Sequence, residues 1–275
     1  MDYIVLVPID EVTLGSAALR QAVELAAGRP GVAVVGLHVV NVIPADEGSA
    51  LQALLAQEPS PVPADVAAWC RAQGEALLAR FTEVCTAAGA RHQARLEVGA
   101  WADRVLHHGQ SADLVVLNRP TAADEPAPGE GADYFDDVIS GLRGAVAVIP
   151  PGAEPARRLL LGWSESGASQ RALRAASRLA RATGLPLEVL AVHDPDQPVP
   201  ERQDVLQHAV LLGLEVELRV APGVPWEALT AAAAAGGPTL IVVGASDKSR
   251  WGRRLWGSTT DSLLDQTDMS VLVVG

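Results

Sequence analysis

The residues best suited to chemistry lie near the end of the chain. An apolar run at 240–243 reaches Gly244, a basic loop follows, and a helix start comes next, formed by Gly257, Ser258, Thr259 and Thr260. Glycine lets backbone N–H groups approach an anion closely, and a helix N-terminus adds hydroxyl donors and the positive end of the dipole. The loop holds one acid, Asp247, and four cations: Lys248, Arg250, Arg253 and Arg254. We interpret this segment as a phosphate-binding loop; the alternative is an ordinary connection with a solvated basic face.

The spacing of Gly244, Asp247, Gly257 and Ser258 resembles the nucleotide-binding signature of the universal stress protein family. That signature has glycine, two residues, glycine, nine residues, glycine, and then Ser or Thr. Asp247 stands where the family usually has the second glycine. A carboxylate facing a triphosphate is repulsive unless it points away or helps to hold a metal ion. The resemblance implies an adenine nucleotide as ligand, either ATP or AMP, with or without Mg²⁺.

The elements that position this loop occur twice in the chain. Five segments match in the same order: 5–10 with 159–164, 35–39 with 190–194, 99–105 with 223–229, 113–118 with 239–244, and 145–149 with 270–274. In each copy, short β-branched runs alternate with alanine-rich helical stretches, the pattern of a parallel sheet with crossover helices. The sequence therefore predicts two domains, 1–152 and 156–275, joined by a proline-rich linker.

The resemblance extends over nearly the whole chain and implies a definite α/β fold. It predicts two tandem doubly wound domains, each an open five-stranded parallel sheet with helices on both faces. Domains of the family usually pair through their last strands. A tandem chain can form that pair within itself, so we expect an internal pseudo-dimer, and further homodimerisation stays open.

The first copy keeps only the nucleoside half of the family's site. The resemblance assigns nucleoside contacts to Asp10 and to the backbone after His38, but Asn118 and residues 132–133 replace the glycine positions. Six acids and no bases follow between residues 124 and 137. Each acid near a phosphate costs on the order of 1 kcal/mol in water and more where shielded. We expect this degenerate copy to exclude ATP; the acidic stretch is either a solvated loop or a site for a divalent cation or basic partner.

The second copy keeps the phosphate half. Ser164 replaces the nucleoside aspartate, and Asp194 stands where the family has an apolar residue. A serine can still form a hydrogen bond with a ribose hydroxyl. Trp163 or Trp251 either stacks on the base or packs between the domains. The candidate nucleotide-binding residues are Gly162, Trp163, Ser164, Asp194, Gly244, Asp247, Gly257, Ser258, Thr259 and Thr260. Four arginines at helical spacing, Arg171, Arg174, Arg178 and Arg181, are interpreted as a solvated helix face.

Charge and composition indicate where the protein is located and which classes of partner are excluded. The net charge of −12 argues against nucleic acid and anionic membranes as partners. Residues 1–152 hold 19 acids and 9 bases, against 14 and 12 in 153–275, so an anion should favour the second copy. The sequence shows no bilayer-length apolar run and no leader pattern. We read Cys70 and Cys85 as reduced thiols and expect a cytoplasmic protein.

The motifs that mark common catalytic sites are missing from the sequence. There is no nucleophile elbow, Walker loop or dinucleotide glycine motif. One hypothesis is a stress-response protein that binds ATP or AMP in the second copy, with at most slow hydrolysis. The other is a scaffold of the same family that has lost the nucleotide and acts through protein contacts. An enzyme of the wider adenine-nucleotide hydrolase-like group would need a further catalytic domain.

Overall fold

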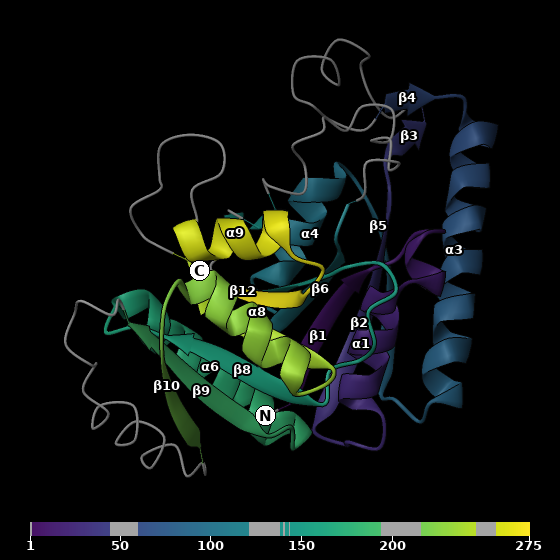
Figure 1. Ribbon diagram of the computed structural model, residues 1–275. Helices are drawn as coiled ribbons and strands as arrows, with labels where there is room; N and C mark the ends of the chain where they lie inside the picture. Colours follow the sequence, from purple (N-terminus) through teal and green to yellow (C-terminus); the bar gives the residue numbers. More distant parts are fainter. Residues whose placement is uncertain are drawn as a thin grey trace. The chain divides into compact units, whose positions relative to one another are not determined.

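The chain folds into two compact units, which we describe separately. The computed structural model describes residues 2–44, 60–120, 138–139, 141–142, 144–193, 216–245 and 257–275. Its first unit is Met1–Leu142 and its second is Arg143–Gly275 (Figure 1). The domain limits derived from the repeat, 1–152 and 156–275, remain a prediction.

The first unit contains a parallel sheet. Its strands are β1 (Tyr3–Pro8), β2 (Val32–Val40), β5 (His92–Val98) and β6 (Leu114–Asn118), in the spatial order β6-β1-β2-β5. The pairs β1–β2, β1–β6 and β2–β5 are all parallel. A separate parallel pair is formed by β3 (Val42–Pro44) and β4 (Ser60–Val62). The two middle strands β1 and β2 are mostly buried, as expected for a parallel sheet covered on both faces.

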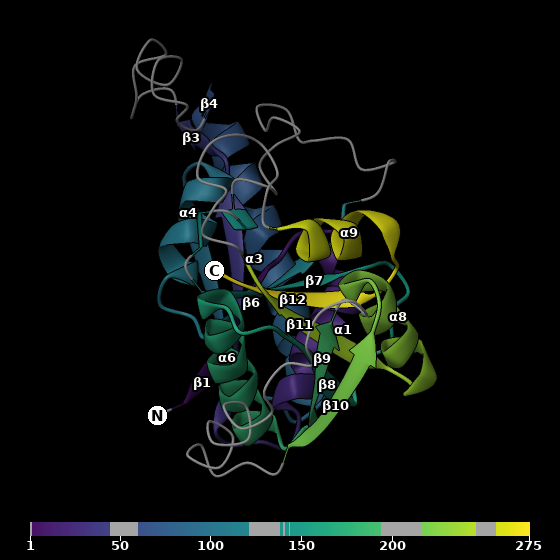
Figure 2. The same ribbon diagram turned by 60° about the vertical axis from the view of Figure 1, so that its left-hand side comes forward.

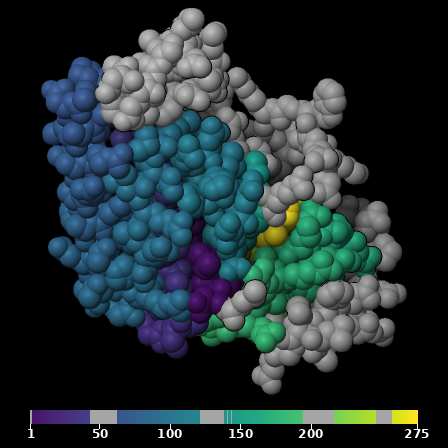
Figure 3. All heavy atoms as spheres, turned by 180° about the vertical axis from the view of Figure 1, so that it is seen from behind, coloured from purple at the N-terminus to yellow at the C-terminus, as the bar shows by residue number. Residues whose placement is uncertain are grey.

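The helical elements of the first unit are η1 (Thr13–Gly15), α1 (Ala17–Ala26), α3 (Ala64–Ala87) and α4 (Trp101–Gly109). Helix α3 packs on β2 and β5 through the fully buried ring of Phe81. A Cβ at Gly36 would lie 2.7 Å from that ring, so glycine makes room for it. Figure 3 shows α3, in blue, on the outer surface, where Trp69 is 62% exposed. No helix in the described part of the chain is both long and apolar enough to cross a membrane.

The second unit contains the predicted five-stranded parallel sheet and one further strand. The strands are β7 (Ala145–Ile149), β8 (Arg158–Trp163), β9 (Leu187–His193), β10 (Glu217–Pro222), β11 (Thr239–Gly244) and β12 (Ser270–Val274). Their order is β10-β9-β8-β11-β12-β7, parallel throughout except for the antiparallel pair β12–β7. Strand β7 is the last strand of the first sequence copy. Its pairing with β12 is the pairing of last strands that the resemblance implies.

The helices of the second unit cover both faces of this sheet, which confirms the predicted doubly wound α/β fold. They are α6 (Gly167–Thr183), α8 (Pro225–Ala235) and α9 (Ser258–Gln266). Figures 1 and 2 show α6 on one face and α8 with α9 on the other, in agreement with their packing. The Ser166 hydroxyl accepts from the Ser169 N–H at the start of α6, and Gly184 ends the helix in the left-handed region at φ 73°.

A buried arginine ties the strands of the second unit together. Arg158, at the start of β8, is 9% exposed. Its guanidinium donates to Thr239 Oγ1 at 2.9 Å, to Glu188 Oε1 at 2.6 Å and to the Ala232 carbonyl at 2.6 Å. These bonds join β8 to β11, β9 and α8. A buried charge is tolerated only when it is paired and hydrogen-bonded, and these bonds meet that requirement for the guanidinium.

Candidate functional site

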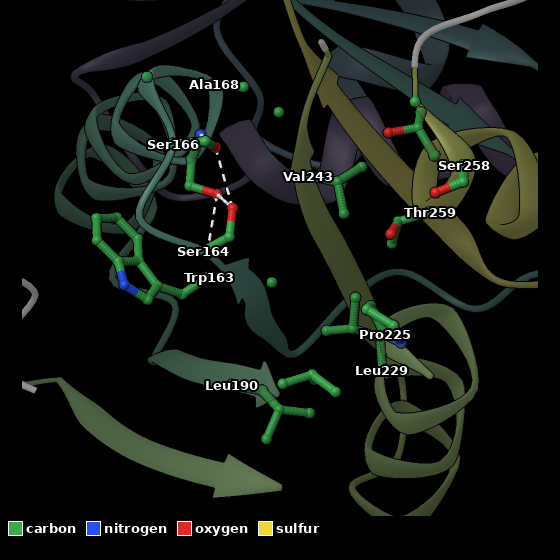
Figure 4. A pocket seen from close by; sticks show the side chains of 17 residues that line it. Trp163, Ser164, Ser166, Ala168, Leu190, Pro225, Leu229, Val243, Ser258 and Thr259 are labelled. Atoms are coloured by element: carbon green, nitrogen blue, oxygen red, sulfur yellow. Dashed lines mark hydrogen bonds between the residues drawn. The ribbon is translucent and has the colours of Figure 1, made fainter. Parts of the chain in front are cut away.

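A pocket of about 390 Å³ opens in the second unit, at the carboxyl ends of β8, β9 and β11 (Figure 4). Three helices begin at its wall: α6 at Ser166–Ser169, α8 at Pro225, and α9 just after Gly257. The strand order reverses here, because β8 lies between β9 and β11. Ligands of open α/β sheets bind at such a switch point.

The floor of the pocket is apolar. It is formed by Leu190 of β9, Leu229 of α8 and Val243 of β11. A Cβ at Gly162 would lie 2.9 Å from Leu229 Cδ1, so glycine at this strand end lets α8 approach β8 closely. Apolar floors with a few convergent polar groups are typical of small-molecule sites.

Three serine hydroxyls form a cluster on the side of α6. Ser164 Oγ lies 3.0 Å from Ser166 Oγ and 2.9 Å from Ser169 Oγ, and the Ser164 N–H donates to Ser169 Oγ at 3.1 Å. Figure 4 shows these bonds at the start of α6. The hydroxyl of Ser164 is therefore already engaged, although a serine oxygen can accept more than one hydrogen bond. Ser166 and Ser169 were not among the predicted site residues, although their N-cap spacing directly after Ser164 was a usable signal.

The opposite wall is the first turn of α9. Gly257 has φ 115° and ψ 144°, a backbone conformation that residues with a Cβ rarely adopt. Because glycine has no side chain, it caps none of the first N–H groups of the helix. Ser258 is exposed, Thr259 is half-buried and Thr260 is buried, and all three line the pocket. The N–H groups and hydroxyls at a helix start are a suitable environment for an anion.

Gly244 lines the pocket, but the packing of a helix, and not of a ligand, explains why this residue is a glycine. A Cβ at this position would collide with the carbonyl carbon and oxygen of Ala168 in the first turn of α6. The close approach that glycine permits is therefore to a helix. In the first unit Asn118 holds the matching position, and its Nδ2 donates to Thr13 Oγ1 at 3.3 Å.

Trp163 lies at the pocket with its ring buried. It is 5% exposed, and Figure 4 shows the ring pointing away from Val243 and Leu229. This direction follows from strand alternation, since the adjacent Gly162 faces α8. Its Nε1 has no hydrogen-bond partner among the described residues. A buried ring that points away from the apolar floor argues against stacking on a base that lies over that floor.

The described lining residues of the pocket carry no ionisable side chain. Arg171 of α6, expected on a solvated face, is instead half-buried, and its guanidinium donates to the main-chain oxygens of Ala245 and Gly275. Arg174, Arg178 and Arg181 are exposed, as expected. No cluster of three His, Cys, Asp or Glu in the described residues is arranged to hold a metal ion.

Several predicted features fall outside the described residues. They are Asp194, Asp247, Trp251, the four loop cations and the acidic stretch 124–137. The remaining candidates, Gly162, Trp163, Ser164, Gly244, Gly257, Ser258, Thr259 and Thr260, all line the one pocket. The structure thus brings together residues from β8, β11 and the start of α9.

The corresponding strand ends of the first unit are arranged differently. Asp10 Oδ1 accepts the N–H of Thr13 at 2.6 Å, and the ring of His38 donates from Nδ1 to the Ile9 carbonyl at 2.7 Å. Element η1 separates Asp10 from Ser16, the N-cap of α1, whereas Ser164 is followed almost at once by the N-cap Ser166. Asp10, the side chain that the resemblance assigns to nucleoside binding, thus makes a local structural hydrogen bond in this unit, and the His38 ring bonds the end of β1.

Comparison with known proteins agrees with this architecture. A family model described as the universal stress protein family matches residues 155–275. The second half of this chain is a universal stress protein domain. A search of curated protein sequences found no match.

Solved structures extend the similarity of this universal stress protein domain to the whole chain. A universal stress protein from Archaeoglobus fulgidus DSM 4304 has a TM-score of 0.68 and 15% identity, covering 98% of this chain and 97% of that one. A Pseudomonas aeruginosa UCBPP-PA14 chain described as a universal stress protein has a TM-score of 0.58 and 15% identity, with coverage of 99% and 93%. The cytoplasmic domain of a prokaryotic cation chloride cotransporter has a TM-score of 0.53 and 12% identity, with coverage of 99% and 95%. These similarities show a shared fold.

Proposed function

We propose that the second unit binds an adenine nucleotide, ATP or AMP, in the pocket at the ends of β8, β9 and β11. The observation that carries this proposal is the combination of an apolar floor with helix N-termini at one cavity. The phosphates would lie at the start of α9, on Ser258 and Thr259, with or without Mg²⁺. The base would lie over Leu190, Leu229 and Val243.

The size and polarity of the pocket support this ligand class. Its volume of about 390 Å³ lies within the range of roughly 300–1,000 Å³ that small-molecule sites occupy. The polar donors gather at Ser164 and at the starts of α6 and α9, whereas the floor between them is apolar. A ligand with an anionic end and a flat apolar end matches that division.

Binding with little or no turnover is the activity that these residues support best. The described lining residues offer hydroxyls and backbone N–H groups, but none has a carboxylate or imidazole to act as a general base. We therefore propose at most slow hydrolysis, within a cytoplasmic stress-response protein. Neither nucleic acid nor anionic membrane is expected as a partner of so acidic a chain.

A non-nucleotide scaffold of the same family is the second candidate. It is favoured by the nucleoside side of the pocket, where Ser164 replaces an aspartate and its hydroxyl is already bonded to Ser166 and Ser169. Trp163 also turns its ring away from the apolar floor (Figure 4). Under this hypothesis the chain would act through protein contacts.

Calorimetric titration of Mg²⁺-ATP into the nucleotide-stripped full-length protein tests the proposal. We expect one site per chain. The variant Ser258→Asp should abolish the heat because it places a carboxylate at the proposed phosphate position. The control Gln266→Glu places the same charge at the exposed far end of α9 and should bind normally. Absence of heat at millimolar ATP would favour the scaffold, and two sites would contradict the expected exclusion of ATP from the first unit.

A further inference from the structure

Arg171 joins the ends of two neighbouring strands to helix α6. Its Nε donates to the main-chain oxygen of Gly275, just after β12, at 3.1 Å. Its Nη2 donates to the carbonyl oxygen of Ala245, just after β11, also at 3.1 Å. One edge of a planar guanidinium presents these two donors in parallel, so a single side chain can engage both strand ends.

The two residues that Arg171 engages are also held through their N–H groups. The Ala245 N–H donates to the Val274 carbonyl at 2.8 Å, and the Gly275 N–H donates to the Gly144 carbonyl at 3.2 Å. Each residue is thus bonded on its donor side by a neighbouring strand segment and on its acceptor side by Arg171. The guanidinium completes a connected set of bonds from α6 through β11 to β12.

This set of bonds lies directly behind the pocket. Ala245 follows Gly244, which lines the pocket and packs against Ala168 in the first turn of α6. Gly167 and Ala168 line the same pocket, and Arg171 comes one turn later on that helix. Arg171 itself is not among the lining residues. Its bonds therefore set the spacing between two walls of the pocket, the start of α6 and the end of β11.

We propose that Arg171 is a positioning residue for the ligand of this pocket, holding the Gly244–Ala245 wall against the first turn of α6. The inference rests on the proposed nucleotide binding for its effect on affinity. Because Arg171 lies outside the lining, its effect on the ligand is indirect. It acts through the paired geometry of its two donors, which hold the wall in place. Lysine keeps the charge but presents one ammonium, so it cannot reproduce that geometry.

The test compares four full-length variants: Arg171→Lys, Arg171→Gln, Arg174→Lys and Arg174→Gln. Arg174 is exposed on the same helix and serves as the matched control. Mg²⁺-ATP affinity is measured by calorimetry well below each melting temperature, so that only folded protein is compared. Both Arg171 variants should weaken ATP binding by about tenfold, the loss expected for a charge-assisted hydrogen bond. Both Arg174 variants should retain wild-type affinity.

A lysine variant that binds ATP like the wild type while the glutamine variant does not would show that charge is what matters, and would overturn the inference. A lower melting temperature with unchanged affinity in both Arg171 variants would also overturn it, since the role would then be structural only.

Amide hydrogen exchange separates this inference from the proposed function, because it needs no ligand. The N–H groups of Ala245 and Gly275 should exchange faster in Arg171→Lys than in the wild type and in Arg174→Lys. If the wild type binds no ATP, the proposed function and the effect on affinity both fail. Faster exchange would then still support the wall contact, whereas unchanged exchange would overturn it too.

Discussion

Replacing Gly244 by alanine tests why this pocket residue is a glycine. The new Cβ would collide with the carbonyl group of Ala168 and lie 2.9 Å from the Ala168 Cβ. No side-chain rotation relieves a collision with main-chain atoms, so β11 or the start of α6 must move by on the order of 1 Å to restore ordinary contact. Overpacking of this kind costs about 1–3 kcal/mol, and we expect the free energy of unfolding to fall by that amount.

The matched control for this substitution is Gly167→Ala, at a second glycine of the same pocket. A Cβ there would meet only Arg171 Nη1, at 3.8 Å, which is an ordinary contact. Alanine in the first turn of a helix should be neutral or stabilising by roughly 0.5–1 kcal/mol. Urea unfolding followed by circular dichroism measures both variants against the wild type.

A loss of less than about 0.5 kcal/mol in Gly244→Ala, within the range of neutral surface changes, would refute the packing argument. Titration with Mg²⁺-ATP then distinguishes the remaining explanation. If affinity falls while stability does not, the glycine serves close approach to the ligand, as the sequence interpretation held. If both fall together, the displaced wall accounts for both effects.

Three further predictions concern other parts of the chain. Gly257→Ala forces a side chain into φ 115° and should cost about 1–3 kcal/mol in urea unfolding; a neutral result would contradict the strained helix start. Glu188→Gln leaves the buried Arg158 without its charge partner and should cost roughly 3–5 kcal/mol, whereas the joint change Arg158→Met with Glu188→Leu should recover most of it; no recovery would show that shape matters more than charge. Burial raises the pKa of the Cys85 thiol to about 12, so a disulfide reagent at mildly alkaline pH should label the half-buried Cys70 first, and rapid labelling of both thiols in the native protein would contradict this. Since the unfolded chain releases that proton near the ordinary value of 9.0 and the folded chain retains it, stability should fall as pH rises from 9 towards 12.

The strands and the first helix of the second unit could be predicted because their signals are local. A buried parallel strand is a short continuous apolar run, as in Leu240–Val243 and Val271–Val274. Helix α6 begins after the N-cap Ser166 and ends at Gly184, and serine and glycine at these positions are local signals of helix ends. The convergence of Ser164 with Ser258 also follows from local rules, because carboxyl ends of parallel strands share one edge of the sheet.

The features that could not be predicted depend on contacts between distant segments. Arg171 is separated from Ala245 by 74 residues and from Gly275 by 104, and on sequence grounds it matched the exposed arginines of its helix. The role of Gly244 depends on the helix that packs across it, which no local pattern specifies.

The antiparallel pair β7–β12 shows that the sequence repeat and the compact unit have different boundaries. By descent β7 is the last strand of the first copy, yet it packs with the second unit and covers one side of β12. A polypeptide cut at the repeat boundary, beginning at residue 156, would leave the N–H and C=O groups on that side of β12 unpaired. Bare strand edges recruit other chains, so such a half should dimerise or aggregate.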